Sequence, residues 1–150
     1  MGALLVRMTD RWRRAGRYSL LVLLLLVAGV LLIVGCKTSA QIVEDITVQE
    51  AFDLIDEEQD NPDFAIIDVR TPEEYAEGHL ENAVNIDFNA DDFEDRINEL
   101  DKDKTYLIYC RSGVRSAGAR DVMEELGFSE VYNILEGIVG WTDTGFPVVK

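Results

Sequence analysis

The chain has 150 residues, with 14 basic and 29 acidic side chains and a formal net charge of −15 at pH 7. A chain of this length normally forms one domain, and its acidity argues against binding to nucleic acid, which requires a basic surface. Because cysteine occurs twice and histidine once, the sequence offers no cluster of ligands typical of a structural metal site, and we expect no metal.

The first 35 residues differ from the rest of the chain. They carry five arginines and one acid, followed by fifteen residues (20–34) without a polar side chain, which is the order of a basic and an apolar region in a signal segment. The run ends in LIVGC, where Gly35 precedes Cys36, and this resembles the lipobox of bacterial lipoproteins, which are cleaved before the cysteine and lipidated on it. The alternative is an uncleaved anchor helix, since residues 18–36 nearly suffice to span a bilayer. Both interpretations anchor the protein in the membrane and place the domain on the extracytoplasmic side, because the arginines stay in the cytoplasm.

After this signal or membrane-anchor segment, nine basic and 28 acidic residues remain. Such a charge indicates a solvated acidic surface and disfavours docking of the domain on anionic lipid headgroups. Only one cysteine, Cys110, lies beyond Cys36, so we expect no disulfide within the domain even in an oxidising compartment.

Residues 36–45 read as a polar tether, and residues 46–150 as the folded domain. Residues 47–58 have a helical pattern that begins with Thr47 and Glu50 in the spacing of a capping box. FAIIDV (64–69) is a continuous apolar strand. Thr71, Pro72 and Glu74 then have the order of a cap, a first-turn proline and a capping glutamate for another short helix.

The remaining elements continue the alternation. AVNIDF (83–88), TYLIYC (105–110) and EVYNI (130–134) predict strands, a stripe of apolar residues after position 92 predicts a helix, and a second stripe over residues 119–126 predicts a helix that ends at Gly127. Apolar strands that alternate with helices indicate an α/β fold with a parallel sheet covered on both faces. Cys110 therefore lies at the carboxyl end of a central strand, where open α/β sheets bind ligands.

The stretch CRSGVR (110–115) suggests chemistry at Cys110. A tight turn that leads into a helix directs backbone N–H groups and the positive helix terminus toward the thiol, and two arginines add charge. Each of these favours the thiolate, which is the nucleophilic form. The alternative is a buried cysteine that acts only as a small hydrophobic residue, but the flanking glycine, serines and arginines are not needed for packing.

Three segments together carry a family resemblance. CRSGVR behind an apolar strand resembles the active-site loop of the rhodanese-type sulfurtransferases, DVRTPEEYAEGHLENAVNI (68–86) resembles their Asp-x-Arg and Gly-His signatures, and LEGIVGWTDTGFPV (135–148) resembles their closing segment. The family often has two adjacent glycines where this chain has Gly137 and Ile138. The resemblance spans about residues 46–149 and implies a rhodanese-like three-layer fold with a central parallel sheet of about five strands.

The resemblance also implies roles for individual residues. Cys110 would accept sulfane sulfur as a persulfide from a small donor such as thiosulfate and pass it to cyanide, a thiol or a protein acceptor, without a cofactor. The persulfide would be cradled by the loop residues Arg111, Ser112, Gly113, Val114 and Arg115, and Arg115 would hold the loop and attract an anionic donor.

In the second segment, the sequence leaves two roles open for Asp68 and for Arg70. Asp68 would either orient an arginine in or beside the loop or act as a cap or turn residue, and Arg70 has the same two alternatives. The resemblance places His79 in a structural turn rather than in the role of a base. Glutamates near the start of the short helix, at positions 73, 74 and 77, are interpreted as helix-terminus charges rather than general acids.

Two alternative functions remain. One is a cysteine phosphatase or an arsenate reductase. Phosphatases that share this fold, like unrelated cysteine phosphatases, resemble one another in having five residues between the cysteine and the arginine, whereas this chain has four, residues 111–114. The shorter loop fits a persulfide sulfur better than a tetrahedral oxyanion and favours sulfur transfer. The second alternative is a module that carries or senses sulfur for a partner protein.

Overall fold

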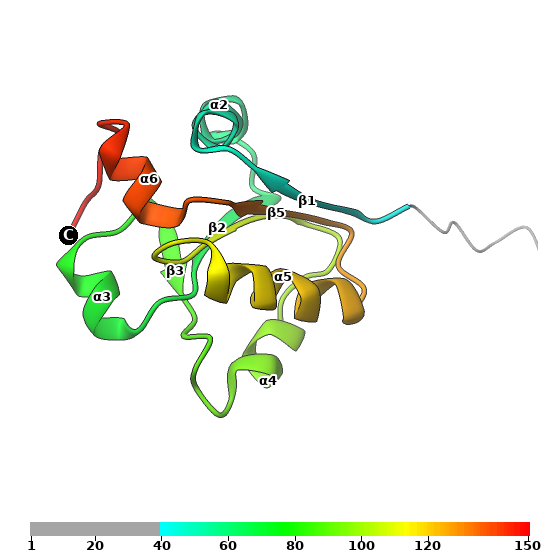
Figure 1. Ribbon diagram of the computed structural model, residues 1–150. Helices are drawn as coiled ribbons and strands as arrows, with labels where there is room; N and C mark the ends of the chain where they lie inside the picture. Colours follow the sequence, from blue (N-terminus) through cyan, green and yellow to red (C-terminus); the bar gives the residue numbers. More distant parts are fainter. Residues whose placement is uncertain (1–39) are drawn as a thin grey trace, which may run out of the picture. The chain divides into compact units, whose positions relative to one another are not determined.

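The computed structural model describes residues 40–150, in which strands and helices alternate along the chain (Figure 1). The signal segment, Cys36 and the first part of the expected tether lie outside the described residues. The elements are β1 (Ile42–Ile46), α2 (Val48–Glu58), β2 (Phe64–Asp68), α3 (Pro72–Glu77), β3 (Ala83–Asn85), α4 (Phe93–Asn98), β4 (Thr105–Tyr109), α5 (Val114–Glu125), β5 (Glu130–Ile134) and α6 (Gly137–Asp143).

The five strands form one parallel sheet in the order β1-β5-β4-β2-β3. The central strand is β4, and its last residue, Tyr109, is in register with Asp68, the last residue of β2. Since parallel strands end at the same edge of the sheet, Cys110 and the residues after Asp68 meet there. This confirms the predicted fold class and the expected position of Cys110.

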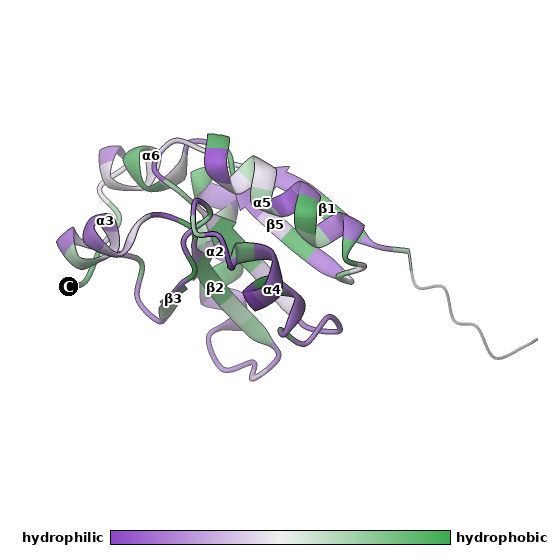
Figure 2. Ribbon diagram, turned by 90° about the horizontal axis from the view of Figure 1, so that it is seen from below, coloured by the Kyte–Doolittle hydropathy of each residue, from purple (hydrophilic) through white to green (hydrophobic). Residues whose placement is uncertain are grey.

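The sheet is covered on both faces because its central strands are apolar on both sides. In β4, Leu107 and Tyr109 pack with α2 and α6, whereas Ile108 and the following Cys110 pack with α4 and α5. Figure 1 shows α2 on one side of the sheet and α4 and α5 on the other. Figure 2 shows that β2 is hydrophobic, whereas α3 and α4 are largely hydrophilic. The alternation of side chains along a strand therefore decides that the thiol faces α5.

Both predicted capping boxes are present. The Thr47 side chain accepts a hydrogen bond from the Glu50 backbone N–H, and Glu50 accepts one from the Thr47 N–H. Thr71 and Glu74 form the same reciprocal pair at the start of α3, with Pro72 as its first residue. Each box satisfies N–H groups that a helix terminus leaves without partners.

The expected tether is wrong over its last residues, because residues 42–45 belong to β1. This strand pairs in parallel with β5, and its register aligns Val43 with Val131 and Ile46 with Ile134. Only Ile46 is buried in it, so its sequence lacks the apolar run that marks the central strands. An edge strand obtains its hydrogen bonds from one neighbour and needs little apolar surface, and for this reason the pattern missed it.

The predicted strand at 83–88 is also shorter than expected, since β3 comprises only three residues, Ala83–Asn85.

No helix within residues 40–150 combines the length and the apolar character required to span a membrane.

Candidate active site

Cys110 lies directly after β4, and its side chain is almost completely buried, with 1% of its surface exposed. It packs within the apolar cluster between the sheet and α5, which includes Val69, Ile86 and Ala119. Burial by itself disfavours a charged sulfur. The chemistry of the thiol is therefore decided by the polar groups that reach it.

The turn after Cys110 depends on Gly113. This residue has a φ angle of +89° and precedes the first residue of α5, Val114. A Cβ atom at this position would lie 1.9 Å from the carbonyl oxygen of Leu135. A side chain is thus excluded both by the left-handed backbone and by the neighbouring chain.

The carbonyl groups of the loop face the first turn of α6. The backbone N–H of Ile138 donates to the carbonyl oxygen of Cys110 at 2.9 Å, and that of Val139 donates to the oxygen of Arg111 at 3.1 Å. Gly137 permits this close approach, because its φ is +57° and a Cβ atom there would lie 2.5 Å from the Cys110 oxygen. Ile138, which stands where the family often has a second glycine, is buried and contributes only its N–H to the loop.

With the carbonyl oxygens of Cys110 and Arg111 bound to α6, N–H groups of the loop are directed toward the sulfur. Burial has the largest single effect on the pKa of Cys110 and raises it, but four hydrogen bonds outweigh burial and lower the pKa below its ordinary value. The donors are the Ser116 hydroxyl and the backbone N–H groups of Ser116, Ser112 and Arg115. The Ser116 oxygen lies 3.4 Å from the sulfur and is itself fully buried. The loop therefore stabilises a thiolate in a site shielded from water.

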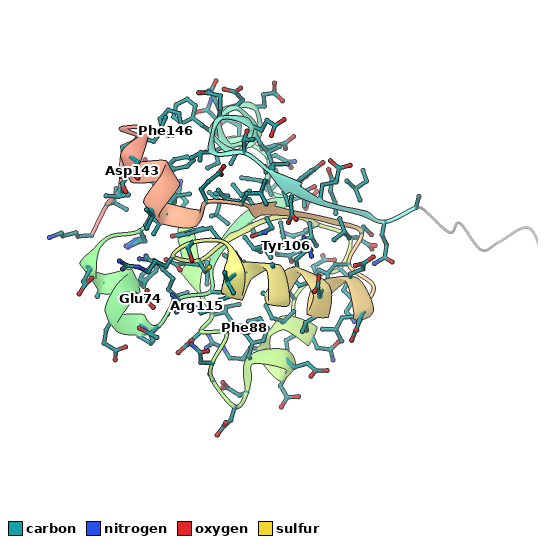
Figure 3. All side chains as sticks on the ribbon, in the orientation of Figure 1. Glu74, Phe88, Tyr106, Arg115, Asp143 and Phe146 are labelled. Carbon is teal, nitrogen blue, oxygen red and sulfur yellow. The ribbon has the colours of Figure 1, made fainter. Side chains whose placement is uncertain are left out.

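Arg115 forms a bidentate ion pair with Glu74. Its Nη1 and Nη2 atoms donate to the two carboxylate oxygens at 2.7 and 2.9 Å, and Figure 3 shows the two side chains meeting between α5 and α3. The hydrogen bond from Arg115 is the main cause that lowers the pKa of Glu74. The planar guanidinium fits this geometry well. The contact connects the first turn of α5 to α3.

Asp68 pairs with Arg70 rather than with an arginine of the loop. Its carboxylate accepts hydrogen bonds from the Arg70 backbone N–H, from Nε and from Nη2, the shortest at 2.6 Å. The Nη2 atom also donates to the carbonyl oxygen of Gly78 at 2.7 Å. Asp68 thus combines both predicted alternatives, since it shapes the turn after β2 and orients an arginine beside the loop.

The remaining predicted residues lie around this centre. The side chains of Arg111, Ser112 and Val114 are exposed, and Val114 is 77% exposed. The ring of His79 stacks on Tyr75 with 3.7 Å between centroids, and His79 forms a β-bridge with Val149, as expected for a structural turn. Within residues 40–150 no three His, Cys, Asp or Glu side chains are arranged to hold a metal ion.

Sequence reasoning missed two contributors to the site. Ser116 lies one residue beyond the predicted loop, residues 111–115. Only the presence of a serine directly after CRSGVR could have indicated its role. The contact of Glu74 with Arg115 joins residues 41 positions apart, and its only signal was a glutamate already accounted for by the capping box.

Comparison with known proteins agrees with this geometry. The family profile described as the rhodanese-like domain matches residues 48–144. A sulfurtransferase of Allochromatium vinosum is 36% identical over 90 residues, which cover 60% of this chain and 82% of the relative. A crystal structure of a rhodanese-related protein from Thermoplasma volcanium superimposes with a TM-score of 0.60 at 29% identity and covers 71% of this chain and 97% of the other.

A second kind of relative is much longer. A tRNA uridine(34) hydroxylase of Erwinia tasmaniensis is 32% identical over 133 residues, and the match covers 75% of this chain but only 37% of that protein. The similarity therefore concerns one part of the hydroxylase. The match over residues 48–144, the parallel sheet and the cysteine loop lead to the same result: the chain belongs to the family of rhodanese-like domains.

Proposed function

We propose that the protein is a sulfurtransferase in which Cys110 carries sulfane sulfur as a persulfide. Sulfur transfer in general is supported by the family and by the sulfurtransferase relative. The observation that carries the assignment to Cys110 is the buried Ser116 hydroxyl 3.4 Å from its sulfur, which together with backbone N–H groups of the loop lowers the pKa of a buried thiol. The same donors can stabilise the negative charge of a persulfide.

The reaction consists of two displacements. The Cys110 thiolate attacks the outer sulfur of thiosulfate, the sulfur–sulfur bond of the donor breaks, and sulfite leaves with the electron pair. An acceptor nucleophile then attacks the outer sulfur of the Cys110 persulfide, and the Cys110 thiolate is the leaving group. A low thiol pKa assists both steps, because it supplies the nucleophile in the first and a good leaving group in the second.

The structure favours sulfur transfer over phosphoryl chemistry. Four residues separate Cys110 from Arg115, and the Arg115 guanidinium is engaged by both carboxylate oxygens of Glu74. An arginine held in this way has fewer N–H donors free to clamp a phosphoryl group. The hydroxylase relatives do not alter the proposal, since the chain matches only part of them and an acidic protein is poorly suited to bind RNA.

The acceptor must come from outside the domain. Cys110 is the only cysteine after Cys36, so residues 37–150 contain no second thiol to take the outer sulfur. We therefore expect a persulfide that persists until cyanide, a thiol or a partner protein removes it. A module that carries sulfur for a partner would share this first step and differ only in the acceptor.

The decisive experiment is the intact mass of the purified protein after incubation with thiosulfate. We expect one added sulfur, its loss on addition of cyanide, and no addition in Cys110→Ser. A wild-type protein that never gains sulfur would contradict the proposal. In a parallel incubation with an aryl phosphate ester, a phosphoryl adduct on Cys110 would indicate phosphoryl transfer instead.

We also propose that the domain is anchored to the membrane through the segment before residue 37 and faces away from the cytoplasm. This rests on the sequence of the signal segment and on the lipobox-like Cys36. In a lipoprotein, Cys36→Ser should abolish lipid attachment, which whole-protein mass and membrane fractionation would detect. Unchanged mass and membrane retention would support the uncleaved helix instead.

A further inference from the structure

A pocket of about 240 Å³ opens beside the cysteine loop and has no assigned role. It lies between the end of α3, the loop, α6 and the C-terminal residues. The side chains that define it are those of Arg70, Glu77, Arg111, Ile138, Val139 and Val148. At about 30 Å³ per water molecule in the liquid, the volume corresponds to about eight waters, which suits a molecule the size of an amino acid.

The pocket presents both signs of charge. Arg111 and Glu77 are exposed, and neither forms an ion pair within residues 40–150, with each other or with any other side chain. Opposite charges that border one pocket without meeting are available to a ligand that carries a negative and a positive group.

Arg70 adds a directed donor to the positive side. The residue is 5% exposed, and its Nε and Nη2 atoms are bound to Asp68 and Gly78. Its Nη1 atom forms no hydrogen bond in the described part of the chain, although the residue borders the pocket. A guanidinium that is held by two of its nitrogens and keeps the third accessible suits an acceptor such as a carboxylate.

The walls of the pocket are apolar and fixed. Ile138 and Val139 belong to the first turn of α6, which is bound to the loop. Val148 is held by the next residue, because Val149 exchanges backbone hydrogen bonds of 2.9 and 2.8 Å with His79. These walls suit a ligand in which a short aliphatic stem connects charged groups to a thiol.

The position of the pocket argues against thiosulfate as its ligand. Arg111 directly follows Cys110, and adjacent Cα atoms are about 3.8 Å apart. The sulfur, however, faces the α5 side of the sheet, whereas Ile138 packs on the α2 and α6 side. A ligand must therefore separate its charges from its sulfur by several bonds, which thiosulfate cannot do.

We infer that this pocket binds the charged end of a small zwitterionic thiol, whose carboxylate meets Arg111 and Arg70 and whose ammonium group meets Glu77, and that this thiol is the sulfur acceptor. The inference rests on the proposed persulfide at Cys110. The acceptor thiol loses its proton to water, its thiolate attacks the outer sulfur, the sulfur–sulfur bond at Cys110 breaks, and the products are the Cys110 thiolate and the persulfide of the acceptor.

Four thiols with the same two-carbon stem allow the effect of the carboxylate on the rate to be measured separately from that of the ammonium group. Cysteine carries a carboxylate and an ammonium group, 3-mercaptopropionate only the first, cysteamine only the second, and 2-mercaptoethanol neither. The rate at which each removes sulfur from the preloaded persulfide is measured by mass spectrometry in wild type, Arg111→Gln, Glu77→Gln and a matched control. The control is Arg96→Gln, because Arg96 is exposed, forms no ion pair with any residue from 40 to 150 and lies away from the pocket.

We expect Arg111→Gln to slow the two carboxylate-bearing thiols about tenfold relative to the other two, as for loss of one hydrogen bond to a charged group. Glu77→Gln should slow the two ammonium-bearing thiols relative to the others, and Arg96→Gln should leave all ratios unchanged. Comparing ratios between variants cancels the differences in thiol pKa. Equal slowing of all four thiols, or no change of the ratios, would overturn the inference.

A binding measurement separates this inference from the proposed function. S-methylcysteine keeps both charges but cannot accept sulfur, and we expect it to shift the NMR amide signals of Val139 and Thr142 in wild type and not in Arg111→Gln. If the protein forms no persulfide but these shifts occur, the proposed function fails and the pocket stands. If the persulfide forms and no shifts occur, the pocket assignment is wrong.

Discussion

Ser116 supplies the only side-chain hydroxyl that reaches the Cys110 sulfur in the described part of the chain. Its oxygen lies 3.4 Å from the sulfur and 3.2 Å from the carbonyl oxygen of Gly113. A hydroxyl has one proton, so it can donate to only one of these acceptors at a time. Ionisation of the thiol makes the sulfur the stronger acceptor, and we therefore expect Ser116 to favour the thiolate.

Replacing Ser116 with alanine should raise the pKa of Cys110. Loss of a hydrogen bond to a charged group costs about 1.5–3 kcal/mol, which corresponds to about one to two pKa units. The rate of alkylation of Cys110 by iodoacetamide against pH measures the shift, and Ser129→Ala is the control because no hydrogen bond of the Ser129 side chain is present in residues 40–150. A wild-type midpoint at or above about 8.5, the ordinary thiol value, would contradict a stabilised thiolate.

Arg115 and Glu74 allow a test of what the arginine does. Arg115→Lys retains the charge but loses the two-pronged contact with the carboxylate, so we expect slower persulfide formation with thiosulfate and an intact fold. If the arginine acts by positioning the loop, Glu74→Gln should slow the reaction as well. If Glu74→Gln accelerates the reaction, Arg115 instead acts by attracting the anionic donor.

The same pair predicts a dependence of stability on pH. Arg115 lowers the pKa of Glu74 in the folded protein, so the pair stabilises the fold above the ordinary carboxyl pKa of about 4.3 and this contribution is lost as pH falls through the lowered value. The side chains are 23% and 25% exposed, which limits the effect to about 1 kcal/mol. Urea unfolding should show that wild type has a larger free energy of unfolding than Glu74→Gln at pH 7. The difference should vanish at a pH below the lowered pKa of Glu74. A difference that persists there would assign it to something other than the ion pair.

At the scale of the elements, the cysteine loop is defined by the two helices that contact it. The first turn of α6 binds the carbonyl groups of Cys110 and Arg111, and α5 begins directly after Gly113. The loop thus lies between two helix termini that both direct N–H groups toward it, one set to its oxygens and one to its sulfur. This arrangement explains how a short turn can present several donors to one atom.

Two glycines provide a matched test of this arrangement. Gly113 and Gly127 have φ angles of +89° and +86°, but a Cβ atom at position 113 would lie 1.9 Å from the Leu135 oxygen, whereas one at 127 would meet nothing within 4 Å. Gly127→Ala should cost only the penalty of the left-handed backbone, about 1–2 kcal/mol. Gly113→Ala should destabilise the protein further and abolish persulfide formation, as measured by urea unfolding and intact mass. Equal destabilisation by the two substitutions would show that the contact with Leu135 is not tight.

At the scale of the whole molecule, charge works against anionic reactants. The net charge is −15, and at an ionic strength of 0.1 M charges are screened beyond about 10 Å. We expect cyanide ion to discharge the persulfide faster as salt increases, because screening weakens the repulsion from the acidic surface. An uncharged trialkylphosphine, which removes the outer sulfur as a neutral nucleophile, is the control and should show little change. A cyanide rate that falls with salt would show that the arginines around the loop dominate the local field.

The sequence by itself determined the alternation of strands and helices, the two capping boxes and the position of Cys110 at the end of the central strand. These features depend on residues close together in the chain: Thr47 and Glu50 are three apart, and the apolar run before Cys110 is continuous. Local hydrogen bonds and the period of hydrophobic residues can be read directly from such a pattern.

Only the tertiary structure decided the features that join distant segments. The edge strand β1 depends on β5, 88 residues later in register, the Arg115–Glu74 pair spans 41 residues, and the loop carbonyl groups are bound by α6. The mostly polar sequence of β1 does not indicate a strand, and the capping role of Glu74 does not indicate that it also binds Arg115. Their partners are chosen by how the helices pack on the sheet, because a hydrogen bond forms only where packing brings donor and acceptor within about 3 Å.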